Sequence, residues 1–237
     1  MKKITILSIG NIHKNLMQFA IDTTLRTVEK DCEEVVTIED EDLNIDKYNQ
    51  MCLKELSGKF KTEFVMVVQY DGMAVKKDYW DESYFNYDYI GAPWPDRFSW
   101  IKPHEKVGNG GFSMRSARLI EALKDDNIRL HNNHPRFKNE DAAICMGYHE
   151  YLKRKHKISY APLELANKFS HEWCNPTGKT FGFHGIWNVP LFFNEDRVIE
   201  YIEQIPKRQW LQDTVQMLVA NCRQKGYLRA IRRFNEK

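Results

Sequence analysis

The sequence lacks the features typical of disulfide frameworks, thiolate metal sites and membrane spans. Its five cysteines, Cys32, Cys52, Cys145, Cys174 and Cys222, are an odd number, lie far apart and form no CxxC pair. This argues against a disulfide framework and a thiolate zinc site, and favours reduced, mostly buried thiols. No apolar run approaches the roughly 18 residues of a membrane span. The N-terminal apolar run is too short for a signal peptide, so we expect a cytoplasmic protein.

The chain also lacks the broad positive charge of a duplex nucleic-acid binder. Its net charge is only +2, and the charge is unevenly distributed. Residues 207–237 carry eight basic side chains against Asp213 and Glu236, a net +6, which leaves −4 for the first 206 residues. We therefore expect no nucleic-acid partner. The basic end is suited to a local contact with an anionic surface.

What the sequence does have is enough apolar residues for a substantial core, arranged as alternating strands and helices. Of its 237 residues, 42% are hydrophobic, which excludes wholesale disorder. The patterns predict strands at 4–9, 34–39 and 64–70, with amphipathic helices at 15–30 and 46–57, the second started by an Asp cap. Strand–helix–strand–helix–strand predicts an α/β fold with a mostly parallel sheet.

The regular alternation stops after the third strand. An aromatic-rich stretch covers 78–107, and a glycine-rich turn is expected at 107–114. We further predict helices at 116–123, 140–151 and over most of 198–237, a short strand at 158–162, and a loop at 169–185. The simplest organisation is a domain at 1–193 followed by a basic amphipathic helical extension at 194–237.

Four features are candidates for chemistry, and each also has an ordinary structural explanation. Asp71 follows the third strand, where ligands bind in open α/β sheets, but Asp is also common in turns. The run from Gly108 to Gly111 permits close approach to a ligand, or is only a turn. Glu140 and Asp141 begin a helix, where acids favour the helix dipole or serve as a general base.

The fourth feature is His184, flanked by glycines and aromatic residues in the segment FGFHG. A neutral imidazole is a common metal ligand, although a single His carries little information. His131, His134 and His171 also raise the question of a zinc site. A proline-containing loop is a poor frame for the first two, so we do not expect zinc there.

Taken together, these motifs resemble a known class of enzymes. Residues 87–94 (YDYIGAPW), 107–113 (VGNGGFS), 139–141 (NED) and 181–185 (FGFHG) resemble one bacterial and viral family of uncharacterised, glycosyltransferase-like proteins within the GT-A fold glycosyltransferases. The resemblance covers about residues 60–190. It implies a Rossmann-type GT-A-like central sheet, mostly parallel and flanked by helices.

The resemblance also implies roles for individual residues. Asp71 matches the last acid of the Asp-x-Asp motif that binds a metal and a nucleotide diphosphate, whereas Gln69 replaces the first acid. His184 matches the His that completes the metal site, which implies Mn²⁺ or Mg²⁺ as cofactor. Asp141 matches the base of inverting members, with Glu140 beside it on the sugar or acceptor.

The remaining roles concern the donor and the acceptor. Gly108, Asn109, Gly110 and Gly111 match the segment where donor and acceptor approach each other. The rings of Tyr89, Trp94 and Trp100 are candidates to stack on the acceptor, or are ordinary packing residues.

The implied reaction moves a hexose from a nucleotide-diphosphate sugar, with uridine diphosphate as the expected nucleotide, to a hydroxyl of a glycan or lipid-linked glycan. A basic amphipathic helix within 207–237 then suggests peripheral contact with the inner face of a membrane, or simply packs on the domain. The alternative function is a non-catalytic module that binds nucleotide sugars or glycans, which the loss of the first acid at Gln69 favours. This sequence lacks the glycine-rich phosphate-binding motif that follows the first strand of nicotinamide-dependent oxidoreductases, so we do not expect that function.

Overall fold

The computed structural model describes residues 2–10, 13–131, 133–173, 179–206 and 212–236. Its strands are β1 (Ile4–Ile9), β2 (Cys32–Ile38), β3 (Phe64–Val68), β4 (Gly72–Ala74), β5 (Tyr89–Pro93), β6 (Val107–Ser116), β7 (Ser170–His171) and β8 (Gly182–His184). The helices of the first two thirds are α1 (Lys14–Val28), α2 (Ile45–Gln50), α3 (Ala117–Ala122), α4 (Pro135–Lys138), α5 (Glu140–Ala142), α6 (His149–Lys155) and α7 (Leu163–Phe169). The helices α8 (Val189–Phe192), α9 (Glu195–Gln204), α10 (Gln212–Lys225) and α11 (Leu228–Glu236) follow.

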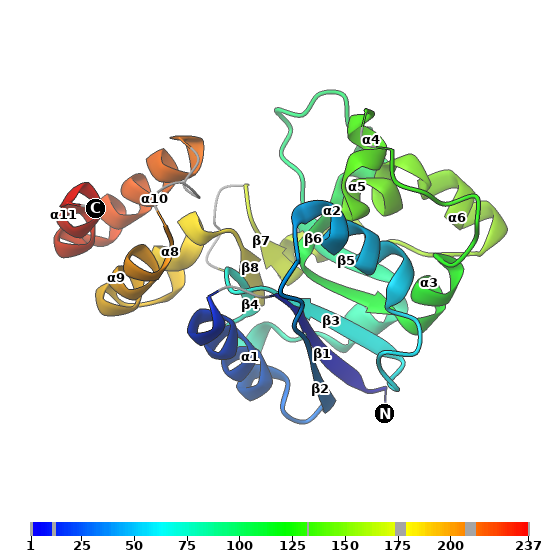
Figure 1. Ribbon diagram of the computed structural model, residues 1–237, viewed down its shortest axis with the longest axis horizontal. Helices are drawn as coiled ribbons and strands as arrows, with labels where there is room; N and C mark the ends of the chain where they lie inside the picture. The colour runs from blue at the N-terminus through cyan, green and yellow to red at the C-terminus, as the bar shows by residue number, and fades with distance from the viewer. Residues whose placement is uncertain (1, 11–12, 132, 174–178, 207–211, 237) are drawn as a thin grey trace.

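The predicted α/β alternation is confirmed in the first 70 residues. β1 pairs in parallel with both β2 and β3, so the chain crosses over once on each side of β1 (Figure 1). The five-stranded sheet has the order β2-β1-β3-β6-β5, and only β6 runs against the other strands. The sheet is therefore mostly parallel, as expected. Helices cover it, and α1 and α2 lie on opposite sides in Figure 1.

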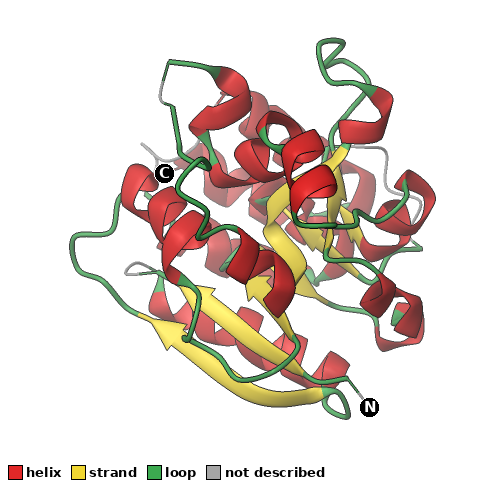
Figure 2. Cartoon of the chain, turned by 90° about the vertical axis from the view of Figure 1, so that its right-hand side faces the viewer, coloured by secondary structure: helices red, strands yellow, loops and turns green. Residues whose placement is uncertain are grey.

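The central strands are buried on both faces because their side chains feed two hydrophobic cores. Ile4, Ile6 and Met66 point into one core with α1, whereas Leu7 and Val65 point into the other. Continuous apolar runs are typical of strands covered on both sides. Figure 2 shows helices packed around the yellow strands.

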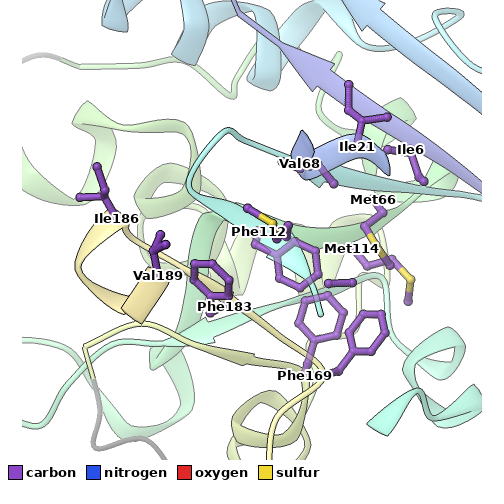
Figure 3. Close-up of a cluster of buried hydrophobic side chains, with 14 of the residues drawn as sticks. Ile6, Ile21, Met66, Val68, Phe112, Met114, Phe169, Phe183, Ile186 and Val189 are labelled. Carbon is purple, nitrogen blue, oxygen red and sulfur yellow. The ribbon is translucent and has the colours of Figure 1, made fainter. Parts of the chain in front are cut away.

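A second, three-stranded sheet of order β4-β8-β7 continues the first core. Phe112 of β6, Phe169 at the end of α7 and Phe183 of β8 lie in the same cluster (Figure 3). The rings of Phe112 and Phe169 stack with centroids 5.0 Å apart. This packing fixes the small sheet against the large one, and so positions the polar groups at the sheet ends.

Several local predictions are wrong, each for a physical reason. Residues 107–114 are not a turn but most of β6, because glycines are tolerated where other groups approach the strand closely. The predicted strand at 158–162 is only a single bridge at Tyr160, and the predicted loop at 169–185 contains β7 and β8. The second helix is capped by Asn44, whose side chain accepts the Lys47 N–H, rather than by an Asp.

Two predicted helices also contain π-helical segments. The helix expected at 46–57 consists of α2 followed by a π-helical segment over Met51–Glu55. The helix expected at 140–151 consists of α5, a π-helical segment over Ala143–Gly147, and α6. Such segments frequently occur at functional sites.

The C-terminal helices lie beyond the small sheet, on the left of Figure 1. Tyr201 and Ile202 of α9, Leu218 of α10 and Ala230 of α11 belong to the same core as the first sheet. Part of the predicted basic extension, 207–211, lies outside the described residues, and its membrane contact stays a prediction. Among the described residues, no helix is both long enough and apolar enough to cross a bilayer.

Candidate active site

The candidate site lies at the carboxyl ends of β1 and β3, where the chain crosses to either side of β1. Ligands bind at such a point in open α/β sheets, because the crossover loops diverge there and leave a crevice. A hollow of about 260 Å³ occupies this position, lined by Ile9, Gly10, Met17, Leu43, Asn44, Ile45, Tyr48, Gln69 and Tyr70. Its lining is mainly apolar, with the polar groups of Tyr48 and Gln69 on one wall.

The small sheet brings Asp71, His184 and Glu172 to the same edge. β4 runs antiparallel to β8 with Gly72 opposite His184, so Asp71 lies beside the end of β8. β7 is parallel to β8, so Glu172, which follows β7, reaches the same end. Glu172 Oε1 lies 3.0 Å from His184 Nδ1, and Asp71 Oδ1 lies 3.8 Å from His184 Nε2.

The two carboxylates favour the protonated form of His184. Burial lowers its pKa, but the charges of Asp71 and Glu172 outweigh that effect and raise the pKa to about 9. Its Nε2 also lies 3.2 Å from the Gln69 side-chain oxygen, and the Gln69 amide donates to the Tyr48 hydroxyl at 2.7 Å. Gln69 is thus fixed by two side chains at the wall of the hollow.

Glu172 is almost fully buried, and burial raises its pKa. Its second oxygen, Oε2, is buried and has no hydrogen-bond partner among the described residues. A carboxylate on the far nitrogen of an imidazole is the usual partner of a metal-binding His. Asp71 and His184 therefore fit the predicted cation once His184 Nε2 has released its proton, because the ion then supplies the positive charge that Asp71 and Glu172 stabilise. Hard divalent ions take one or two protein carboxylates and fill their other positions from ligand or water.

A bulge in β6 forms the opposite wall. Gly91 of β5 pairs with Ser113, whereas the next residue, Ala92, pairs with Asn109, so residues 110–112 bulge out of the ladder. The released N–H of Gly110 donates to Asp141 Oδ2 at 3.1 Å, and that of Gly111 donates to Asn109 Oδ1 at 3.0 Å. Bulges of this kind occur next to active sites, where they redirect polar groups.

Gly110 and Gly111 in the bulge cannot be replaced by larger residues without displacing neighbours, because other side chains lie against both of them. A Cβ on Gly111 would lie 2.1 Å from His184 Nε2, and a Cβ on Gly110 would lie 2.4 Å from Glu140 Oε1 and 3.0 Å from Asp141 Cβ. The structure therefore brings together the Asp71–His184 pair and Asp141, along one short stretch of β6. Their convergence was predicted from widely separated motifs.

Asp141 has the properties of a proton acceptor near neutral pH. Burial, followed by the negative charge of Glu140, raises its pKa to about 7, despite hydrogen bonds from the Gly110 and Ala142 backbones. The N–H of Ala142 donates to Asp141 Oδ1 at 2.6 Å. A carboxylate with a pKa near the working pH is well matched to general base catalysis.

Glu140 occupies a different environment from its neighbour. Its Oε1 accepts from Arg115 Nη2 at 2.9 Å, and both side chains are almost completely buried. Glu140 Oε2 and Arg115 Nη1 are buried, and no group in the described part of the chain forms a hydrogen bond with either atom. The backbone N–H of Glu140 donates to Asn49 at 3.0 Å, which ties the start of α5 to α2. Glu140 therefore positions the bulge and Asp141 through its pair with Arg115.

Other predicted residues lie away from this arrangement. Tyr89 is fully buried and donates its hydroxyl to the Gly108 carbonyl at 2.6 Å, and Trp94 packs against Gly108 with 8% exposure. Neither ring can stack on an acceptor sugar, so for these two residues the packing alternative holds. Trp100 is 49% exposed and keeps an open ring. Asn109 uses its side-chain oxygen within the bulge.

Sequence reasoning missed Glu172, Arg115 and Tyr48. Arg115 did have a visible signal, since it interrupts an otherwise apolar and small-residue stretch that becomes a buried strand. Glu172 follows a two-residue strand whose pairing no sequence pattern indicates. Tyr48 was taken as one of the apolar positions of its helix.

Comparisons with known proteins add a family but no activity. No curated protein matches the chain. A family model described as "Protein of unknown function (DUF5672)" matches residues 33–184. This range contains β2 except for its first residue, the strands from β3 to β8, and every candidate site residue from Gln69 to His184. Because it covers nearly two thirds of the 237 residues, the chain belongs to the DUF5672 family.

Proposed function

We propose that the protein is a metal-dependent glycosyltransferase of the GT-A type. It transfers a hexose from a nucleotide-diphosphate sugar, with uridine diphosphate as the expected nucleotide, to a hydroxyl of a glycan or lipid-linked glycan. One observation carries this proposal. Asp71 and His184 adjoin one side of the bulge at Gly110 and Gly111, and Asp141 adjoins the other side, at the carboxyl edge of the sheet.

The hollow beside β1 and β3 is suited to the nucleoside of the donor. Its apolar lining matches the face of a base, and Gln69 offers a fixed amide to ribose or base. Asp71 follows Gln69 and Tyr70 in the chain, and His184 lies beside Asp71 in space, so both are next to the nucleoside site where the diphosphate would follow. They would hold Mn²⁺ or Mg²⁺, which neutralises negative charge on a leaving diphosphate.

Asp141 is the catalytic base in this proposal. Its carboxylate accepts the proton of the acceptor hydroxyl as the hydroxyl oxygen forms a bond to the anomeric carbon, and the bond from that carbon to the diphosphate oxygen breaks. A single displacement of this kind inverts the configuration. The Gly110 N–H holds Asp141 in place, and the buried Arg115–Glu140 pair fixes the helix start that carries it. Trp100 is the remaining aromatic candidate for the acceptor.

The test separates binding from turnover. Calorimetry with uridine diphosphate and Mn²⁺ should show binding by the wild type, with affinity at least about tenfold weaker in Asp71→Asn and His184→Ala. Asp126→Asn, on an exposed loop, is the control and should bind normally. Unchanged affinity in both site variants would remove the cation site from the proposal.

Turnover is measured as release of uridine diphosphate from a panel of nucleotide sugars. Asp141→Asn should lower this rate by about 10² to 10⁴ while donor binding persists. A rate within about twofold of wild type would exclude Asp141 as the base. If the wild type bound the donor but turned over none of the sugars with any acceptor, the result would instead favour the non-catalytic binding module. That alternative is suggested by Gln69, which stands where the Asp-x-Asp motif has its first acid.

A further inference from the structure

A second group of metal-ligating side chains lies apart from the candidate active site. His104, His149 and Glu150 each offer one ligand atom, and these atoms lie within 4.8 Å of one another. His104 belongs to the 3-10 turn Pro103–Glu105 that leads into β6, whereas the other two begin α6. None of the three was singled out by the sequence motifs.

His149 is the preorganised member of the group. It is buried, its ring stacks on Tyr160 with centroids 4.2 Å apart, and Nδ1 lies 3.1 Å from the Cys145 carbonyl. A carbonyl only accepts hydrogen bonds, so Nδ1 carries the proton and Nε2 presents its lone pair. This is the usual arrangement of a metal-binding His, in which a backbone carbonyl fixes the tautomer.

His104 and Glu150 complete the group from the surface. His104 Nε2 lies 3.9 Å from Glu150 Oε1 and equally far from Glu105 Oε1. Glu105 is held by Arg136, and Glu150 Oε2 lies 3.4 Å from Arg154. His104 and Glu150 are about half exposed, so small side-chain rotations bring the three ligand atoms within the roughly 4 Å that two ligands of one zinc ion allow.

The group borders a large hollow. The hollow has a volume of about 520 Å³, and His104, His149, Lys153, Lys157 and Tyr160 are among its lining residues. Three protein ligands leave one position of a tetrahedral ion open, as in zinc sites that bind a further ligand. Lys153 and Lys157 make an anion the natural occupant of that position.

We propose that His104, His149 and Glu150 form a binding site for a transition-metal ion of the Zn²⁺ class, with an open position toward this hollow. Two imidazoles and a carboxylate suit Zn²⁺ and its neighbours, whereas Mg²⁺ prefers oxygen ligands. The bound ion links the segment before β6 to α6. It therefore fixes the end of the loop that carries Trp100, four residues before His104.

The experiment is a titration of the full chain with Zn²⁺ in excess Mg²⁺, followed by calorimetry, with Co²⁺ absorption as the second readout. Wild type should bind Zn²⁺, and Co²⁺ should give the visible spectrum of a four-coordinate site. His104→Ala and Glu150→Gln, both at exposed positions, should each weaken binding at least about tenfold. His131→Ala is the control for a surface histidine and should bind as wild type.

Asp71→Asn distinguishes this site from the proposed donor site. It should retain the Zn²⁺ binding that His104→Ala loses, whatever its effect on nucleotide binding. Loss of Zn²⁺ binding in Asp71→Asn but not in His104→Ala would assign the ion to the other site and overturn the proposal. Absence of Zn²⁺ binding by the wild type, or equal affinity in His104→Ala and Glu150→Gln, would overturn it as well.

Discussion

The C-terminal helices and the candidate active site both gather charged side chains, and they treat charge in opposite ways. Arg229 of α11 reaches Glu195 at 2.9 Å and Asp196 at 2.8 Å on α9, near the surface. Burial opposes ionisation of Glu195, but hydrogen bonds from Ala230 and Arg229 outweigh it and lower the pKa. At the candidate active site, burial instead raises the pKa of Asp141.

The difference shows what each set of charges does. A lowered carboxyl pKa means that ionisation stabilises the folded state, whereas a raised pKa means that ionisation destabilises it. The C-terminal charges therefore hold helices together. The site keeps buried acids next to one another at a cost in stability, which is typical of groups retained for binding or catalysis.

The largest effect is expected from the buried ion pair. Arg115→Met leaves Glu140 buried and without its partner, so the free energy of unfolding should fall by about 3–5 kcal/mol. Urea denaturation measures it. The double variant Arg115→Met/Glu140→Leu is the control, and it should recover most of the loss because neither charge remains. If the double variant were as unstable as the single one, packing rather than charge would explain the effect.

The second comparison is between a glycine of the β6 bulge, Gly111, and a glycine between the C-terminal helices, Gly226. A Cβ on Gly111 overlaps the His184 ring, so Gly111→Ala must displace the imidazole from Asp71 and Glu172. We expect Mn²⁺ affinity to fall at least about tenfold by calorimetry. The control is Gly226→Ala between α10 and α11, where φ is +74° but no atom lies within 4 Å. That change should cost about 1 kcal/mol of stability and leave Mn²⁺ binding intact.

Asp141 gives a smaller, pH-dependent effect on stability. Its folded pKa of about 7 lies above the unfolded value of 3.8, so the folded state holds the proton more tightly. The stability that this tighter proton binding adds to the folded state is therefore fully present below about pH 4 and is lost as the pH rises through 7. Asp141→Asn removes this loss, and its stability relative to wild type should rise by about 2–3 kcal/mol between pH 5 and 8. Denaturation curves at four pH values test this, and a constant difference would contradict it.

How far the sequence predicts the fold follows from the length of each element. β1, α1 and β3 are long enough to show their period, and their patterns predict them within a few residues. β6 was missed because its glycines are typical of a turn. In the structure Gly110 and Gly111 are needed instead because the Glu140 and His184 side chains lie against the strand, and these residues are thirty or more positions away along the chain.

Prediction of the candidate site is limited in the same way, by contacts between segments that lie far apart in the sequence. Asp71, Asp141 and His184 were found because each stands in a recognisable motif. Glu172 and Arg115 were missed because their importance depends on strand register, which puts Glu172 behind His184 and Arg115 beneath the bulge. The role of Tyr89 stayed open because an aromatic residue in a motif looks the same whether its ring faces a ligand or the core.

The smallest effect is expected at the C-terminal helices. Arg229 is 63% exposed and Asp196 is 75% exposed, so water and salt screen their attraction. Arg229→Met should change Tm by no more than about 2 °C. The Glu195 carboxylate still accepts the backbone N–H groups of Arg229 and Ala230, which keeps the start of α11 in place. Thermal denaturation at low and high salt measures the change. A loss comparable to that of Arg115→Met would mean that the surface pairs stabilise the fold as strongly as the buried one, and the contrast between the two regions would be wrong.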